Sequence, residues 1–236
     1  MTLSKTAENA IRAYGGRDLW QKAQTIEADV SVTGLAFTLK RRPFFTHAKI
    51  TANIHRPFCK LTPIGQNAGV TGVLDAHHVR LEDENGNVTA ERDHARKFFG
   101  WNRRLFWWDD LDMAYFANYA FWNYFTLPAL LMHPDIDWEE IGTNRLQARF
   151  PETLPTHSAL QQFTFDPATG QLLQHDYTAD IISGLAKAAN VVLAHEENES
   201  GLVYPSHRRV TPRGIGGAPL GRPVLIDIRV HAFRLQ

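Results

Sequence analysis

The feature that most limits the possible folds is a run of twenty uncharged residues, Met113 to Met132, within a chain of 236 residues. An aromatic stretch leads into it, and thirteen of the 26 Phe, Trp and Tyr residues fall between Phe98 and Phe125. Such a run could be a membrane span, a buried core helix or the wall of an apolar site. The sequence on either side of it decides which interpretations survive.

The sequence before this run alternates with a period of two, as half-buried β-strands do. The first stretch has its apolar positions at Ile26, Ala28, Val30 and Val32. After Gly34 the apolar phase shifts to Leu35, Phe37 and Leu39, which predicts a bend at that glycine in a strand that continues beyond it. Residues 45–55 then place one apolar face on Ala48, Ile50, Ala52 and Ile54.

Turn signals separate further short strands. Asp75-Ala76 and Asn85-Gly86 predict two turns within residues 69–93, and Asp166-Pro167 with Gly170 predicts a later hairpin. After the aromatic run we expect strands at residues 146–150, 160–165, 171–178, 189–196, 202–210 and 223–235.

The first residues have a helical pattern, with apolar positions three and four residues apart from Ser4 to about Ala23 and a stop signal at Gly15-Gly16. Together the patterns predict a β-rich α+β fold. We expect a single strongly curved antiparallel sheet, a half-open barrel, with an N-terminal helix and a central aromatic helical insertion that covers the concave face. One domain, 1–236, is predicted, with a helical part (1–24), a first β part (25–97), the aromatic insertion (98–135) and a second β part (145–236).

The membrane-span interpretation is disfavoured because Asn118, Asn123, Thr126 and Pro128 lie inside the run. A span would also place the two β parts on opposite sides of a bilayer and divide the sheet that they are expected to share. We therefore expect no integral membrane span. The core-helix and site-wall interpretations stay open, so the helix is either a plug that fills the sheet or a lid over a cavity.

Charge and cysteine content exclude several classes. Lys and Arg number 25, as do Asp and Glu, so no net charge favours binding to nucleic acid or to an anionic membrane. The one cysteine, Cys59, rules out an internal disulfide and is expected to be a small buried residue. The N-terminal stretch has no apolar segment typical of a secretory signal, which predicts a cytoplasmic protein.

Three stretches resemble the lipoprotein-carrier (LolA/LolB-like) superfamily. AENAIRAYGGRDLWQKAQTIEADV resembles its opening helix and first strand, and GVLDAHHVRLEDENGN resembles its repeated strand, turn and strand. FTFDPATGQLLQHDY followed by GLVYPSHRRV resembles its later hairpin and Pro-containing strand. The resemblance implies an unclosed, curved sheet whose helices enclose a hydrophobic cavity for acyl chains. The chain lacks the family's signal peptide and the cysteine of its anchored members, so only fold and cavity are carried over.

The aromatic insertion supplies the candidate binding residues. Tyr115, Tyr119 and Trp122 fall on one helical stripe, and their polar tips on apolar rings suit a site that orients a ligand. Arg103 could meet an acidic head group. The predicted ligand-binding set is Trp107, Trp108, Tyr115, Phe116, Tyr119, Trp122 and Arg103.

The histidines divide by strand face. His47, His55 and His231 lie on polar faces and are expected to be exposed, whereas His77 and His175 are expected to point inward. His77 or His175 could serve as a base, with Tyr177 as a hydrogen-bond donor, although structural histidines are commoner. No metal-ligand spacing is present, so neither a metal nor a cofactor is predicted.

We therefore predict a soluble binding or carrier protein for a small to medium hydrophobic molecule, lipid-like or aromatic, in a cavity lined by residues 106–125. The alternative is a cofactor-independent isomerase, cyclase or hydrolase that acts on an apolar substrate in the same cavity. A third hypothesis is a protein that binds a partner through an exposed aromatic patch, which would promote self-association. The sequence does not predict the oligomeric state.

Overall fold

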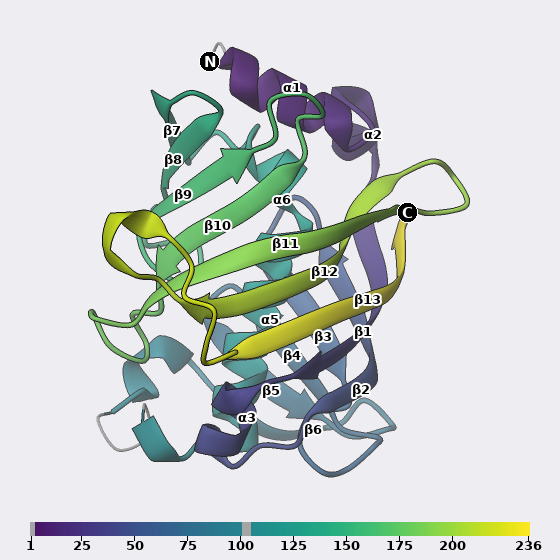
Figure 1. The fold of residues 1–236 in the computed structure, drawn as a ribbon. Helices are drawn as coiled ribbons and strands as arrows, with labels where there is room; N and C mark the ends of the chain where they lie inside the picture. Colours follow the sequence, from purple (N-terminus) through teal and green to yellow (C-terminus); the bar gives the residue numbers. More distant parts are fainter. Residues whose placement is uncertain (1–2, 101–104) are drawn as a thin grey trace.

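The computed structural model describes residues 3–100 and 105–236, and its strands form one antiparallel sheet (Figure 1). The order along the sheet is β6-β5-β4-β3-β2-β1-β13-β12-β11-β10-β9-β8-β7, so β1 and β13 join the two β parts. The sheet is not closed and ends at β6 and β7. The strands are β1 (Thr25–Thr33), β2 (Phe45–Asn53), β3 (Phe58–Thr62), β4 (Thr71–Asp75), β5 (His78–Glu82), β6 (Val88–Arg92), β7 (Asp137–Gly142), β8 (Arg145–Arg149), β9 (Leu160–Phe165), β10 (Leu172–Thr178), β11 (Lys187–Glu197), β12 (Val203–Pro212) and β13 (Ile226–Leu235).

Helices occupy the inside and the two ends of this curved sheet. The long helix α5 lies between the β3–β5 part of the sheet and the β11–β13 part, while α1 and α2 lie near one end and α3 near the other (Figure 1). The expected half-open barrel with a central helix on its concave face is therefore confirmed. The helices are α1 (Lys5–Ala13), α2 (Arg17–Lys22), α3 (Leu35–Lys40), α5 (Asp110–Phe125) and α6 (Leu127–Leu130), with short 3₁₀ turns η1 (Ala95–Phe98) and η2 (Ile215–Gly217).

Helix α5 begins at a charged cap. Asp109 accepts a hydrogen bond from the backbone N–H of Asp112 at 2.7 Å, and Asp112 accepts one from the N–H of Asp109 at 3.1 Å, which forms a capping box. Arg92, at the end of β6, donates to both carboxylates at 2.7 Å. The acidic residues before the uncharged run therefore start the helix and tie it to the edge of the sheet.

The polar residues inside the uncharged run attach the helix to its surroundings. The side-chain amide of Asn118 donates to the carbonyl of Gly72 at 3.0 Å, that of Asn123 to Pro155 at 2.9 Å, and the indole of Trp122 to Asn53 at 2.9 Å. These bonds satisfy buried donors of the helix with carbonyls from three separate segments of the chain. No described helix is long and apolar enough to cross a membrane.

Most predicted elements are present within a few residues of the expected bounds, including the two N-terminal helices and both hairpin turns. The inward positions of β1 and β2 are buried, and Cys59 is fully buried as expected. Strands β3 and β7 were not predicted. The β3 sequence, FCKLT, is only five residues long, and β7, DWEEIG, is an exposed edge strand with three acidic residues.

The predicted continuation of the first strand beyond Gly34 is wrong. Residues Leu35–Lys40 form α3. Gly34 has φ of +134°, and a side-chain carbon there would lie 2.3 Å from the carbonyl oxygen of Leu225, so the chain turns away from the sheet at a position open only to glycine. Phe37 then packs edge-on against Phe45. Leu39, which the alternation placed on the same strand face as Phe37, is instead an exposed residue of the helix.

Candidate functional site

An apolar cavity of about 290 Å³ lies between α5 and the inner face of the sheet formed by β1, β11, β12 and β13. Its volume is near the lower end of the range for small-molecule sites, roughly 300–1,000 Å³. Its described lining side chains are Val32, Ala36, Phe37, Leu39, Lys40, Phe45, Trp108, Met113, Phe116, Ala117, Ala120, Phe121, Tyr124, Tyr177, Ala179, Ile182, Leu185, Ala186, Lys187, Ala188, Val210, Pro212, Leu225, Ile226 and Ile228.

Helix α5 is both part of the core and a wall of the cavity. One of its faces, at three- and four-residue spacing, lines the cavity and comprises Met113, Phe116, Ala117, Ala120, Phe121 and Tyr124. The opposite face packs on the sheet, where Ala114 and Asn118 lie against Gly72 of β4. The small side chains of Ala117 and Ala120 leave room in the middle of the cavity wall, which larger residues would fill.

The mouth of the cavity lies between α3 and the residues that lead into β11. Leu39 and Leu185 lie at this mouth and are 48% and 88% exposed. Trp108 is held there by its backbone N–H, which donates to the carbonyl of Lys40 at 3.2 Å. An apolar mouth of this kind gives a hydrophobic molecule a path from the surface into the cavity.

Two lysines provide positive charge at the same place. Lys40 lines the cavity with only 6% of its surface exposed, and its ammonium group lies 5.2 Å from the centre of the Trp108 ring. Burial lowers the pKa of Lys40 to about 8, because the charged form loses solvation. Lys187, two residues after Leu185, also lines the cavity and is exposed.

The inner end of the cavity is closed by two phenols. The hydroxyls of Tyr124 on α5 and Tyr177 on β10 hydrogen-bond to each other at 2.8 Å, and Nε2 of His157 lies 2.9 Å from the Tyr124 hydroxyl. Burial raises the pKa of Tyr124 to about 12 and lowers that of His157 to about 3. Tyr124 and His157 are therefore neutral near pH 7, and the two phenols present weakly polar atoms to the cavity.

A buried arginine lies behind these phenols. Arg208 on β12 is 1% exposed, donates to the carbonyl of Tyr124 at 3.1 Å and lies over the Tyr124 ring at 5.3 Å. That carbonyl belongs to the last turn of α5, where the helix dipole attracts positive charge. Arg208 thus stabilises the end of the central helix. Burial lowers the pKa of nearby His175, with smaller contributions from His157 and Arg208.

The residues predicted to bind a ligand occupy several places. Trp108 and Phe116 line the cavity. Trp107 is exposed, and Arg103 lies outside the described residues. The predicted stripe of Tyr115, Tyr119 and Trp122 is fully buried and is not part of the cavity lining that the structure describes.

The candidate catalytic residues are also separated. Tyr177 lines the cavity, and His175 is buried behind it, with Nε2 at 2.5 Å from the side-chain oxygen of Gln161. The inward placement of His175 is confirmed, but that of His77 is not. His77 lies in the turn between β4 and β5, is half-buried and borders a surface groove between η1 and residues 150–159.

Sequence reasoning missed most of the cavity. The alternating pattern predicts a strand where Lys40 and the other α3 residues lie, and the periodicity of β1, β12 and β13 does not indicate which of their positions line a cavity. His157 was overlooked because it lies in a loop with no periodic pattern, although it has more aromatic neighbours than the other histidines named above. The signal that could have found the wall was the pair of alanines, Ala117 and Ala120, on one face of an otherwise bulky helix.

The sequence matches no protein-family model and no curated protein sequence. Its fold is similar to that of a DUF1329 family protein from Desulfovibrio piger, with a TM-score of 0.53 and 13% identity over 98% of this chain and 91% of that one. A putative outer membrane lipoprotein-sorting protein domain from Vibrio parahaemolyticus gives a TM-score of 0.52 and 9% identity, with 98% and 91% of the chains covered.

A LolA superfamily protein from Nitrosomonas europaea gives a TM-score of 0.52 and 7% identity, covering 100% of this chain and 94% of that one. At these identities the likeness concerns the arrangement of strands and helices alone. It agrees with the half-open barrel and the central helix described above. The chain therefore has a LolA-like fold.

Proposed function

We propose that the protein binds a hydrophobic molecule in the cavity between α5 and the sheet and acts as a carrier or binding protein. The observation that supports this most directly is the chemistry of the lining. The described lining side chains are apolar, with the indole of Trp108 among them, and the exceptions are Lys40, Lys187, Tyr124 and Tyr177. The atoms that line an apolar cavity of this size lack dispersion contacts on one side, and an apolar ligand would supply them.

The cavity size limits the ligand. A volume of about 290 Å³ lies near the lower end of the range for small-molecule sites, roughly 300–1,000 Å³. This suits a single short acyl chain or an aromatic molecule. The fold neighbours include a putative lipoprotein-sorting domain and a LolA superfamily protein, which supports a ligand of lipid-like character.

The catalytic alternative has less support. A general base works best with a pKa near the operating pH. The pKa of His157 is lowered to about 3 and that of His175 well below its usual value, in both cases chiefly by burial. Both imidazoles also make hydrogen bonds to neighbouring side chains. They are therefore weak bases that act as structural partners.

The hypothesis of an exposed aromatic patch is also weakened. The α5 residues Tyr115, Tyr119 and Trp122 are buried in the molecule, and the exposed aromatics among the described residues of the segment come before the helix, at Phe98, Phe106 and Trp107.

Binding can be tested with two variants of opposite size. Ala120→Trp places an indole in the cavity, and Phe116→Ala enlarges it. We expect Ala120→Trp to weaken binding of the neutral dye N-phenyl-1-naphthylamine at least about tenfold, equivalent to 1.4 kcal/mol. Phe116→Ala should retain the dye. Ala168→Trp, in the exposed turn between β9 and β10, is the matched control for adding a tryptophan.

Fluorescence titration measures the dye, and native mass spectrometry of the purified protein reveals a co-purified lipid-like species. Circular dichroism confirms that each variant is folded. Equal dye affinity in the wild-type protein and Ala120→Trp would contradict binding in this cavity, as would the absence of any dye binding.

A further inference from the structure

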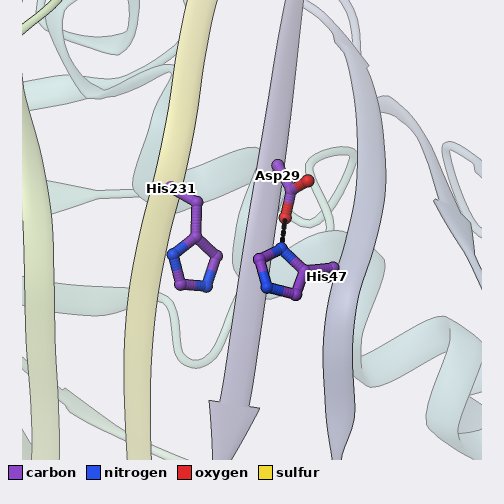
Figure 2. Close-up of side chains that lie close together, drawn as sticks. All are labelled: Asp29, His47 and His231. Carbon is purple, nitrogen blue, oxygen red and sulfur yellow. Dashed lines mark hydrogen bonds and ion pairs between the residues drawn. The ribbon is translucent and has the colours of Figure 1, made fainter.

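Three polar side chains from three neighbouring strands meet on the outer face of the sheet. Asp29 is on the central strand β1, His47 on β2 and His231 on β13 (Figure 2). They point away from α5, because Ala28 and Val30, the neighbours of Asp29 on the strand, are buried against the core. This Asp29–His47–His231 cluster has no connection with the cavity, which lies on the opposite face.

Backbone irregularities bring the two histidines to this position. Between β1 and β2 the register shifts from Val30↔Ala48 to Val32↔Phe45, so that His47 belongs to a bulge opposite Ser31. Between β1 and β13 the register shifts from Asp29↔Ala232 to Val30↔Val230, which leaves His231 as the extra residue of a second bulge. Bulges change the direction of a side chain and are frequent beside functional sites.

The bulge in β2 is strained. His47 has φ of +47°, in the left-handed region that a residue with a side chain seldom occupies. Such a conformation persists only where the surrounding structure holds it in place. The strain here holds one imidazole toward its partners on the next two strands.

The ligand atoms are close together. Nδ1 of His47 lies 3.0 Å from Oδ1 of Asp29, and the rings of His47 and His231 stack with 4.4 Å between their centroids and 27° between their planes. One ligand atom from each of the three residues lies within 4.8 Å of the others. Bonds of about 2.1 Å at tetrahedral angles place ligand atoms roughly 3.4 Å apart, so small side-chain rotations would complete the geometry.

The surrounding groups suit a metal site open to solvent. Both histidines are exposed, whereas Asp29 is half-buried between them. The hydroxyl of Ser31 accepts from the backbone N–H of His47 at 3.2 Å and lies 2.9 Å from Nε2 of His231, so it helps to orient the cluster. Lys49 forms an ion pair with Asp29 and would compete with a cation for this carboxylate.

We propose that Asp29, His47 and His231 bind a divalent first-row transition-metal ion that prefers imidazole nitrogen, such as zinc, with water completing its coordination. Two imidazoles and a carboxylate are ligands typical of zinc and related ions, whereas calcium and magnesium prefer oxygen alone. The bound ion would join β13, β1 and β2 at the junction of the two β parts of the sheet.

The test is isothermal titration of the full chain with zinc chloride. We expect one ion per chain, and we expect His47→Ala and His231→Ala each to weaken binding at least about tenfold. His55→Ala, an exposed histidine just beyond the same strand, is the matched control and should bind as the wild-type protein does. Zinc should also raise the melting temperature, and a chelator should reverse this rise.

Lys49→Ala tests whether Asp29 binds the ion together with the histidines or whether the two surface histidines bind it alone. Loss of the competing ammonium group should tighten zinc binding several-fold, whereas Asp29→Asn should weaken it. The urea midpoint of each variant without metal shows whether it is folded. The proposal is overturned if zinc does not bind, or if His55→Ala weakens binding as much as the cluster variants. An unchanged or weakened affinity in Lys49→Ala would remove Asp29 from the ligand set.

Discussion

The imidazole of His157 lies flat on the phenol ring of Tyr177, with 3.8 Å between the ring centroids and 7° between the planes. Its Nε2 atom contacts the hydroxyl of Tyr124, which also bonds to Tyr177. Burial, with a smaller contribution from the charge of Arg96, lowers the pKa of His157 to about 3. The inner end of the cavity therefore depends on a neutral histidine held between two phenols.

This arrangement makes the protein sensitive to acid. An unfolded histidine has a pKa of about 6.5, so between pH 6.5 and 3 the unfolded chain binds a proton that the folded chain does not. The free energy of unfolding should then fall with decreasing pH by about 1.4 kcal/mol per unit for His157. Urea unfolding at pH 6.5, 5.5 and 4.5 measures the slope. His157→Phe should reduce this slope by about 1.4 kcal/mol per pH unit, the amount that one proton contributes. Equal slopes in the two proteins would contradict the prediction.

Arg92 is expected to be important for stability. It bonds to Asp109 and to Asp112, which is fully buried, and so holds the start of α5 against β6. Arg92→Leu takes away one of the groups that compensate the buried carboxylate of Asp112, and breaking a buried ion pair in this way costs about 3–5 kcal/mol. Arg92→Leu should lower the free energy of unfolding by about this amount. The matched control is Arg56→Leu, which breaks an exposed pair with Asp75 and should cost at most about 1 kcal/mol. Equal losses in urea unfolding would refute the distinction.

Gly72 sets the distance between α5 and β4. A side-chain carbon at this position would lie 2.7 Å from the methyl group of Ala114 and 2.7 Å from Ile64. Gly72→Ala should therefore destabilise the protein by about 1–3 kcal/mol, because the helix must move away from the strand. Gly142→Ala, where the added carbon meets no atom within 4 Å, should have little effect. Chemical unfolding of both variants checks this, and equal stability would show that the contact can relax.

Lys40 is expected to make the binding of acidic ligands dependent on pH. Since burial lowers its pKa to about 8, the ammonium group is charged below that pH and neutral above it. The affinity for the anionic dye 8-anilinonaphthalene-1-sulfonate should fall as pH rises from 7 to 9, while that for neutral N-phenyl-1-naphthylamine should not change. Lys40→Met should remove the fall. If the anionic dye binds equally at both pH values, Lys40 has no role in recognising charge.

Local patterns were sufficient for much of the fold. A curved sheet around one buried helix was predicted from the alternation in β1 and β2, the Asn85-Gly86 turn and the uncharged run. This was possible because burial of one face of a strand or helix sets the spacing of its apolar residues, which is visible in a short stretch of sequence. The prediction failed at α3, where the conformation depends on the approach of Leu225, a residue far along the chain, to Gly34. No local pattern records such a contact.

The sequence alone thus determined that β-strands would surround an aromatic helix, since these features follow from hydrophobic periodicity and from the charges at the helix start. The tertiary structure decided which side of that helix meets a cavity. Apolar residues surround α5 on every face, so periodicity could not distinguish the stripe of Tyr115 and Tyr119 from that of Ala117 and Ala120. It also decided that His47 and His231 meet across β1, because strand register and bulges are set by pairing between distant segments.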